Sequence, residues 1–379
     1  MEDISLQSKI DVLSEEQVLI QDSAVAFIAQ DEELKRVRAS RFTQPGYDKA
    51  VWQEMAESGW LGFLVPEEYD GVGLSFSELN LVLIQLGKGL SPAPFVSTAV
   101  AAARALVKGD NEALKKEKLP LLVAGEWTPA LAWQEVRADL SEKASAVTCA
   151  NDVLNGVKRF VPDAGGADAF IVSAATDAGT ALYLVDKDAA GISIEYEQRV
   201  DGGFYGHITF VDTPVSAVVA AAGNSEGQGE AVLAVVLDET RVAVSAELLG
   251  VMTRALEISV DYITQRVQFD KPIGSFQALQ HKTVDLFILT EISRSVLLQA
   301  ATVFDSDASA RERAIAASQV KARCSDAALT IGKDAIQLHG GIGYTDEANI
   351  GLYLKKAMYL SSWLGGASAH RARYAELTL

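Results

Sequence analysis

The sequence predicts an α+β protein made, in chain order, of a helical domain, a β-domain and a four-helix bundle. Apolar residues recur at helical spacing up to about residue 125, and long amphipathic segments return from about 226 to 379. Between them, short β-branched runs alternate with glycine-containing turns. We therefore expect an N-terminal helical domain (1–125), a middle antiparallel β-domain (126–225) and a C-terminal helical bundle (226–379).

The N-terminal helices are marked by start and stop signals. Ser14 followed three residues later by Gln17 is a capping box and predicts a helix start. Pro66 and the glycines within 71–73 interrupt the pattern before a further helix predicted over 77–90. The apolar run over 98–106 is too short to cross a bilayer, and Arg104 interrupts it.

The middle segment has the pattern of a small antiparallel sandwich or barrel. No helical periodicity lies between its strand-like runs, which are separated by turn residues such as Gly179 and Gly191. The runs occur at 146–148, 154–157, 170–172, 181–185 and 207–211.

The C-terminal segment is predicted to be four long helices. Pro272 and the paired Gly340 and Gly341 separate them, and no internal repeat or low-complexity linker occurs. The amphipathic segments run over 230–268, 275–304, 308–340 and 347–376.

Composition excludes several classes of protein. The net charge of −18 disfavours binding to nucleic acid or to an anionic membrane. The two cysteines, Cys149 and Cys324, form no metal-binding or redox motif, and the four histidines show no metal-ligand spacing. The first residues lack the basic and apolar regions of a signal peptide, so we expect a cytoplasmic protein with no membrane span.

Two segments at helix ends carry residues suited to a dinucleotide. The first, 266–277, offers the Arg266 guanidinium for phosphate oxygens and the Gln277 amide for the edge of a base. The second, 337–344, has three glycines in four positions, which allow close approach of backbone N–H groups. Taken alone, the first segment is also explained by a helix–helix corner with a solvated arginine, and the second by a glycine C-cap that ends a helix.

Together these segments resemble the acyl-CoA dehydrogenases. The family's pattern R-x-x-F-x-x-P-I-x-x-F-Q is matched from Arg266, and Q-x-x-G-G-x-G-Y is matched from Gln337. The segment 59–75 is similar to the family's helical-domain signature, and 154–158 is similar to its L-N-G-x-K hairpin. The resemblance covers nearly the whole chain and extends to actinobacterial members that act on bulky, sterol-like acyl-CoAs.

The resemblance implies a non-covalent FAD held between subunits, usually in a homotetramer. Arg266 and Gln277, with Phe269 and Phe276 beside them, would contact the pyrophosphate and adenylate of a neighbouring subunit's FAD. Gln337, Gly340 and Gly341 would lie against the ADP portion, also across the interface. The flavin ring would rest on two strand segments, with these cofactor-binding residues: Leu131, Trp133, Gln134, Phe160, Val161 and Pro162.

The sequence departs from the family pattern at positions expected near the flavin ring and at the position of the catalytic base. In the T-E-P-x-x-G-S-D loop, here 133–139, the threonine is Gln134 and the serine that helps to bind CoA is missing. The late catalytic glutamate falls on Leu364, and the alternative position falls on Thr240. The missing late glutamate predicts room for a branched or polycyclic acyl group.

One carboxylate, Glu247, is our candidate for the base. It lies seven residues after Thr240 on the same helical face, in an apolar stretch where an unpartnered carboxylate is costly to bury. The alternative is an ion pair with Arg254 or with an arginine across an interface. Arg241, next to Thr240, would bind the CoA arm of the substrate or form a structural ion pair.

The resemblance then implies FAD-dependent oxidation of an acyl-CoA thioester to its trans-2-enoyl form, with electrons passed to an electron-transfer flavoprotein. An alternative is a non-catalytic partner subunit of an α₂β₂ heterotetramer, which the altered loop and Leu364 would suit. An oxidase that uses O₂ on the same fold is a third alternative.

Overall fold

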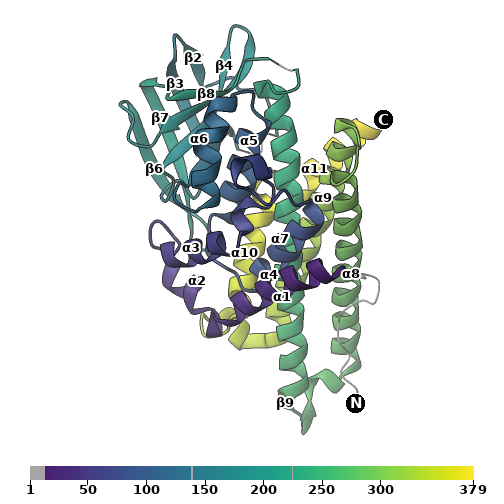
Figure 1. Cartoon of the computed structure of the whole chain (residues 1–379). Helices are drawn as coiled ribbons and strands as arrows, with labels where there is room; N and C mark the ends of the chain where they lie inside the picture. The colour runs from purple at the N-terminus through teal and green to yellow at the C-terminus, as the bar shows by residue number, and fades with distance from the viewer. Residues whose placement is uncertain (1–12, 138–139, 224) are drawn as a thin grey trace.

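The N-terminal part of the chain is helical, as predicted. A computed structural model, shown in Figure 1, describes residues 13–137, 140–223 and 225–379. The capping box is confirmed: Ser14 Oγ accepts from the Gln17 N–H at 3.1 Å, and Gln17 Oε1 accepts from the Ser14 N–H at 3.1 Å. The elements are α1 (Glu15–Ala29), α2 (Lys35–Ser40), α3 (Lys49–Glu57), α4 (Phe76–Lys88), the π-helical η4 (Phe95–Ala102), α5 (Ala103–Lys108) and α6 (Glu112–Val123).

The middle part is one sheet with both antiparallel and parallel pairs, so the purely antiparallel prediction was wrong. The order is β6-β7-β3-β2-β4-β5-β8, and β1 pairs with β4 in parallel, because the β2–β3 hairpin intervenes in the chain before β4 returns beside β1. The strands are β1 (Pro129–Ala132), β2 (Thr148–Ala150), β3 (Val153–Pro162), β4 (Ala169–Thr176), β5 (Gly179–Asp186), β6 (Ile192–Gln198), β7 (Phe204–Pro214) and β8 (Ala217–Ala220).

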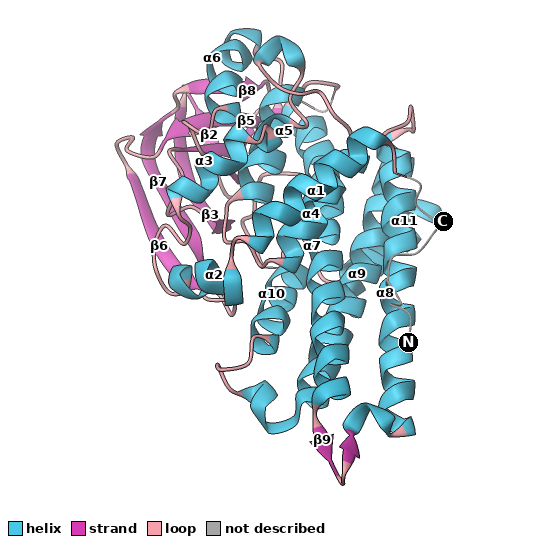
Figure 2. Cartoon of the chain, turned by 60° about the horizontal axis from the view of Figure 1, so that its bottom comes forward, coloured by secondary structure: helices cyan, strands magenta, loops and turns pink. Residues whose placement is uncertain are grey.

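The C-terminal part is a helical bundle whose last predicted segment is two helices. The break follows α10, where Leu364 and Gly365 adopt positive φ angles of 62° and 102°. Figure 2 shows α7, α8 and α9 running side by side. The elements are α7 (Gly229–Gln265), the hairpin strands β9 (Val267–Gln268) and β10 (Lys271–Pro272), α8 (Gln277–Phe304), α9 (Ala310–His339), α10 (Ile350–Ser362) and α11 (Ala367–Thr378).

Glycine sets the close crossing of α4 and α7, which positions Glu247. A Cβ at Gly250 would lie 1.9 Å from the Ile84 carbonyl oxygen, and one at Gly87 would lie 2.2 Å from the Glu247 carbonyl oxygen. Both contacts are with backbone, so no side chain can move aside to relieve them. The two helices can therefore approach this closely only because neither residue has a side chain.

We predict that Gly250→Ala destabilises the protein by about 1–3 kcal/mol, because the added methyl group forces the helices apart. Gly351→Ala is the matched control, since this helical glycine has only an ordinary contact at 3.8 Å. Alanine there should be neutral or slightly stabilising. Chemical denaturation of the two variants measures the difference, and equal midpoints would contradict the role given to the crossing.

The helix α8 has an apolar outer face. Among the described residues it is the one helix long and apolar enough to cross a membrane by length and composition, with 28 residues and a mean hydropathy of 1.4. It packs against α7 and α9 in the bundle, and 33% of its most apolar window is buried. An exposed apolar stripe of this kind marks an interaction surface. The stripe consists of Val284, Phe287, Ile288, Ile292 and Leu298.

Candidate functional site

A cavity lies where α4, α10, the loop after β3 and the loop after β6 meet α7. Its volume is about 80 Å³. Leu83 and Leu86 of α4 and Trp363 after α10 supply apolar walls, while Glu247 of α7 supplies a carboxylate. The candidate base therefore does line a cavity.

Glu247 is paired within the chain. Its Oε1 lies 2.7 Å from Nζ of Lys356 on α10, and the residue is 7% exposed. Lys356 Nζ also lies 5.6 Å from the centre of the Tyr359 ring. The ion pair predicted with Arg254 is not formed, since Arg254 pairs with Glu257 at 3.0 Å. Sequence reasoning missed Lys356, because it comes from a separate helix and belongs to no motif.

The loop after β6 adds a second charged group to the cavity. The Arg199 guanidinium pairs with Asp201 through Nε at 3.0 Å and stacks on Tyr359, with Cζ 3.8 Å from the ring centre. Asp163, at the end of β3, accepts a hydrogen bond from Ser97 Oγ at 2.6 Å. Burial acts to lower the pKa of Arg199, but Tyr359 and the two aspartates outweigh it and raise the pKa.

Aromatic side chains lie next to Leu364, the late glutamate position. Leu364 is 3% exposed, and Trp363 stacks on Tyr359 with ring centres 5.8 Å apart. The cavity of about 80 Å³ is well below the roughly 300–1,000 Å³ of ordinary ligand sites. Tyr359 and Trp363 both line this cavity, and extra room for a polycyclic group stays a prediction.

The strands predicted to support the flavin ring keep little open surface. Leu131, Trp133, Val161 and Pro162 are buried by the chain's own atoms, and none of the six predicted ring residues lines the cavity. Gln134 and Phe160 are only half-buried. These two residues are therefore the ones that can still present a side chain to a ring.

Backbone groups of Gln134 and Phe160 already form hydrogen bonds within the chain. The Gln134 carbonyl accepts from the Arg159 N–H at 2.7 Å, and the Phe160 N–H donates to His207 Nδ1 at 3.3 Å. The positive φ of Phe160, 54°, coincides with a shift of register between β3 and β7. The Arg137 guanidinium lies 5.6 Å from the centre of the Phe160 ring. Arg137 therefore lies close to one of the two side chains that could face a flavin ring.

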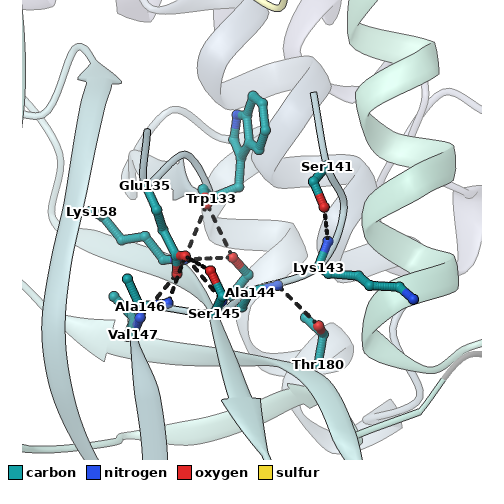
Figure 3. A network of polar contacts seen from close by, with 11 residues as sticks. Trp133, Glu135, Ser141, Lys143, Ala144, Ser145, Ala146, Val147, Lys158 and Thr180 are labelled. Atoms are coloured by element: carbon teal, nitrogen blue, oxygen red, sulfur yellow. Dashed lines mark hydrogen bonds and ion pairs between the residues drawn. The ribbon is translucent and has the colours of Figure 1, made fainter. Parts of the chain in front are cut away.

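A buried ion pair fixes the loop next to these strands, as Figure 3 shows. Lys158 Nζ lies 2.6 Å from Glu135 Oε1 and donates to the Trp133 carbonyl at 3.1 Å and to Ser173 Oγ at 2.9 Å. Glu135 also accepts the N–H groups of 145–147 at 2.8–3.0 Å. Lys158 is the lysine of the L-N-G-x-K hairpin, and the pairing gives that motif a structural role. Ala138 and Asp139, further along this loop, lie outside the described residues.

The environment keeps Glu135 ionised. Burial opposes ionisation of its carboxyl group, but Lys158 and the backbone N–H groups outweigh that effect and lower the pKa of Glu135 to about 2. Burial lowers the pKa of Lys158 to about 8. The pair is thus oppositely charged at neutral pH, and each charge depends on the other.

The residues predicted to bind the ADP portion face outward at the far end of the bundle. Arg266, Gln277 and Gln337 are exposed, and a Cβ at Gly340 or Gly341 would meet nothing within 4 Å. Phe269 is 85% exposed and meets Phe276 edge to face at 6.0 Å. An exposed guanidinium, amides and an open glycine corner suit the phosphates and base of a dinucleotide.

The two parts of the predicted FAD site lie apart in one chain. The β9–β10 hairpin projects from the end of the bundle away from the sheet (Figure 1). Arg266, the C-cap of α7, comes nineteen positions after Glu247, which corresponds to about 28 Å along the helix axis. Glu247 and the residues predicted to bind the ADP portion thus lie far apart along α7, which is in line with the expectation that a neighbouring subunit supplies one part of the FAD site.

Arg241 lies in the core, away from the cavity. It is 0% exposed, and its Nη1 lies 2.6 Å from Asp238 Oδ1, which also pairs with Arg373 at 2.7 Å. A side chain with no exposed surface cannot reach a CoA arm. The structure therefore corrects the substrate-binding prediction in favour of the structural ion pair. No cluster of three metal-ligating side chains occurs among the described residues.

The chain belongs to the acyl-CoA dehydrogenase family. The family's C-terminal domain profile matches residues 227–377, and its N-terminal domain profile matches 14–126. Its relatives include steroid members from actinobacteria. Its fold is the acyl-CoA dehydrogenase fold, of N-terminal helices, a central mixed sheet and C-terminal helices.

Three relatives illustrate the match. The chain is 28% identical to "Acyl-CoA dehydrogenase IpdE2" of Mycolicibacterium smegmatis, over 93% of this chain and 96% of that protein. It is 31% identical to an "Acyl-CoA dehydrogenase" of Bacillus subtilis, over 80% and 83%. Among solved structures, a variant of the "Tcur3481-Tcur3483 steroid ACAD" is 32% identical with a TM-score of 0.85, and 96% of this chain and 97% of that one are covered.

Proposed function

We propose that this chain is a subunit of an FAD-dependent acyl-CoA dehydrogenase that converts a CoA thioester to its trans-2-enoyl form, with Glu247 as the base. The observation that carries the proposal is the buried Glu247 carboxylate in the wall of the cavity. In this role Glu247 takes the α-proton of the thioester, and Lys356 holds the carboxylate in place at 2.7 Å. Electrons pass on to an electron-transfer flavoprotein.

The proposed cofactor arrangement divides FAD between subunits. Arg266, Gln277 and the 337–341 corner hold the ADP portion for a neighbour, while Gln134 and Phe160 of the other chain face the ring. FAD, when bound, supplies the acceptor for the hydride from the β-carbon. The middle β-domain then forms the flavin and substrate side, and the C-terminal bundle forms the FAD and oligomer interface. The apolar stripe of α8 supports assembly into a homotetramer or an α₂β₂ heterotetramer.

A second candidate is the non-catalytic partner subunit of a heteromeric acyl-CoA dehydrogenase. It is favoured by the small cavity, by Leu364 at the late glutamate position and by the restricted ring surface around Phe160. The Lys356 pairing would then be purely structural. The similar steroid ACAD is named for two chains, Tcur3481 and Tcur3483. In this role the chain would supply Arg266 and the glycine corner to a flavin held by its partner.

Flavin absorbance of the purified protein tests the proposal. The protein should be yellow, and an acyl-CoA should bleach it when no homologous chain is present. Arg266→Ala should lose flavin, whereas Arg254→Ala should keep it, because Arg254 is an exposed arginine of the same helix in a surface ion pair. A colourless protein that becomes yellow and reducible only with a second homologous chain would establish the partner role instead.

A further inference from the structure

We infer that the cavity beside Glu247 recognises an uncharged oxygen, a ketone or a hydroxyl, on the acyl group, with Arg199 as the specificity-determining residue. The inference rests on the proposed function, because it takes the cavity as the acyl site. It adds the chemical class of the substrate, which neither the fold nor the family match specifies. Two arginine nitrogens in the cavity wall, both buried and without an acceptor among the described residues, carry it.

One nitrogen of Arg199 has no hydrogen-bond partner among the described residues. Its Nε and Nη2 bind Asp201 at 3.0 and 3.2 Å, while Nη1 is buried and has no hydrogen-bond acceptor among the described residues. Asp163 Oδ1 is 3.7 Å from Nη1, which is beyond hydrogen-bond distance. The side chain is only 10% exposed. A buried donor without an acceptor costs about 1–3 kcal/mol, so an acceptor from a ligand is expected.

The guanidinium cannot turn away from the cavity. It lies between Tyr359 at 3.8 Å and Tyr205 at 5.6 Å, measured from Cζ to the ring centres. On the backbone side, a Cβ at Gly203 would lie 2.2 Å from Nη2, so the guanidinium packs directly against that glycine. Nη1 is thus held on the side of Asp163, which itself lines the cavity. This is a built site and not a mobile surface arginine.

A second unpartnered donor belongs to the same wall. Arg41 lines the cavity, and its Nε is buried with no hydrogen-bond acceptor in the part of the chain that the structure describes. Its two Nη groups are already used by Asp346, at 2.8 and 2.7 Å. A ketone or hydroxyl oxygen accepts up to two hydrogen bonds, so it can accept from Nη1 of Arg199 and still take a second donor from this wall.

The charges of the wall exclude a carboxylate. The three cationic residues, Arg41, Arg199 and Lys356, are balanced by three anionic residues, Asp163, Asp201 and Glu247. A ligand carboxylate would be a further anion without a counterion of its own in this wall, and burying an unpaired charge is strongly unfavourable. A neutral oxygen uses the free N–H groups and leaves the balance intact.

The test compares three thioesters that differ in one group: 5-oxohexanoyl-CoA, its 5-methylidene analogue and glutaryl-CoA. Binding to the assembled, flavin-containing protein is measured by calorimetry, so the result does not depend on turnover. The ketone should bind at least about tenfold more tightly than the methylidene analogue, and glutaryl-CoA should not share the gain. Arg199→Met should remove the difference in affinity between the ketone and the methylidene analogue.

A control separates misfolding from loss of recognition. Gly203→Ala keeps the guanidinium but displaces it, so it should also reduce the preference while thermal unfolding and flavin content report on the fold. Equal affinities for ketone and methylidene in the wild type, or a preference that survives Arg199→Met, would overturn the inference. Failure of the proposed function appears separately, as ligand binding without bleaching of the flavin.

Discussion

Replacing Glu247 by glutamine should leave flavin bound and slow its reduction by acyl-CoA by about 10²- to 10⁴-fold. The amide has the shape of the carboxylate but cannot accept a proton, and the residue is buried where water does not replace it easily. Stopped-flow bleaching measures the rate, and the absorbance spectrum before mixing measures the flavin content. A large fall in rate at constant flavin content identifies the base.

The same helix offers a matched control. Glu257 is also on α7 and also pairs with a lysine, Lys88 at 2.8 Å, but it does not line the cavity. The flavin of the Glu257→Gln variant should therefore be bleached by acyl-CoA at the wild-type rate. Wild-type bleaching by Glu247→Gln in the absence of a second homologous chain would remove Glu247 as the base, and another group of this chain would have to take the proton.

Local signals in the sequence were sufficient to predict most of the helices and strands of the fold. The Ser14 capping box and the breaks at Pro66 and around 71–73 depend on residues a few positions apart, so they can be read from the sequence. The division of the last segment into α10 and α11 depends on distant contacts. Buried Lys321 on α9 donates to the carbonyls of Leu360, Ser361 and Gly365, and so fixes the turn between the two helices.

The candidate site was predictable only where one segment supplies it. The 266–277 and 337–341 residues are each contiguous, and their exposure at the end of the bundle follows from helix ends. Lys356 and Arg199 come from elements that meet Glu247 only in the folded chain. Their positions in the sequence therefore do not predict that they line the same cavity. The parallel β1–β4 pairing has the same origin, since strand direction depends on how the hairpin between them folds back.

Lys158→Met should destabilise the protein by about 3–5 kcal/mol, because it leaves the Glu135 carboxylate buried without its cation. Lys158 is 0% exposed and Glu135 only 6%, so water cannot take the place of the ammonium group. Chemical denaturation is best done near neutral pH, below the pKa of about 8 of Lys158, where the wild-type pair carries both charges. Arg371→Met is the control, since Arg371 and Asp326 are 59% and 51% exposed and their pair should contribute about 1 kcal/mol or less.

Acid should remove the effect of Lys158→Met. The pKa of Glu135 is lowered in the folded protein from 4.5 to about 2, so its contribution to stability is complete above pH 4.5 and is lost as pH falls towards 2. The difference in free energy of unfolding between wild type and Lys158→Met should therefore become smaller over that pH interval. Protonation removes the carboxylate charge of Glu135, which only the wild type can pair with a cation. A gap that stays constant down to pH 2 would mean that Lys158 acts by packing alone, and the lysine of the hairpin motif would need a different explanation.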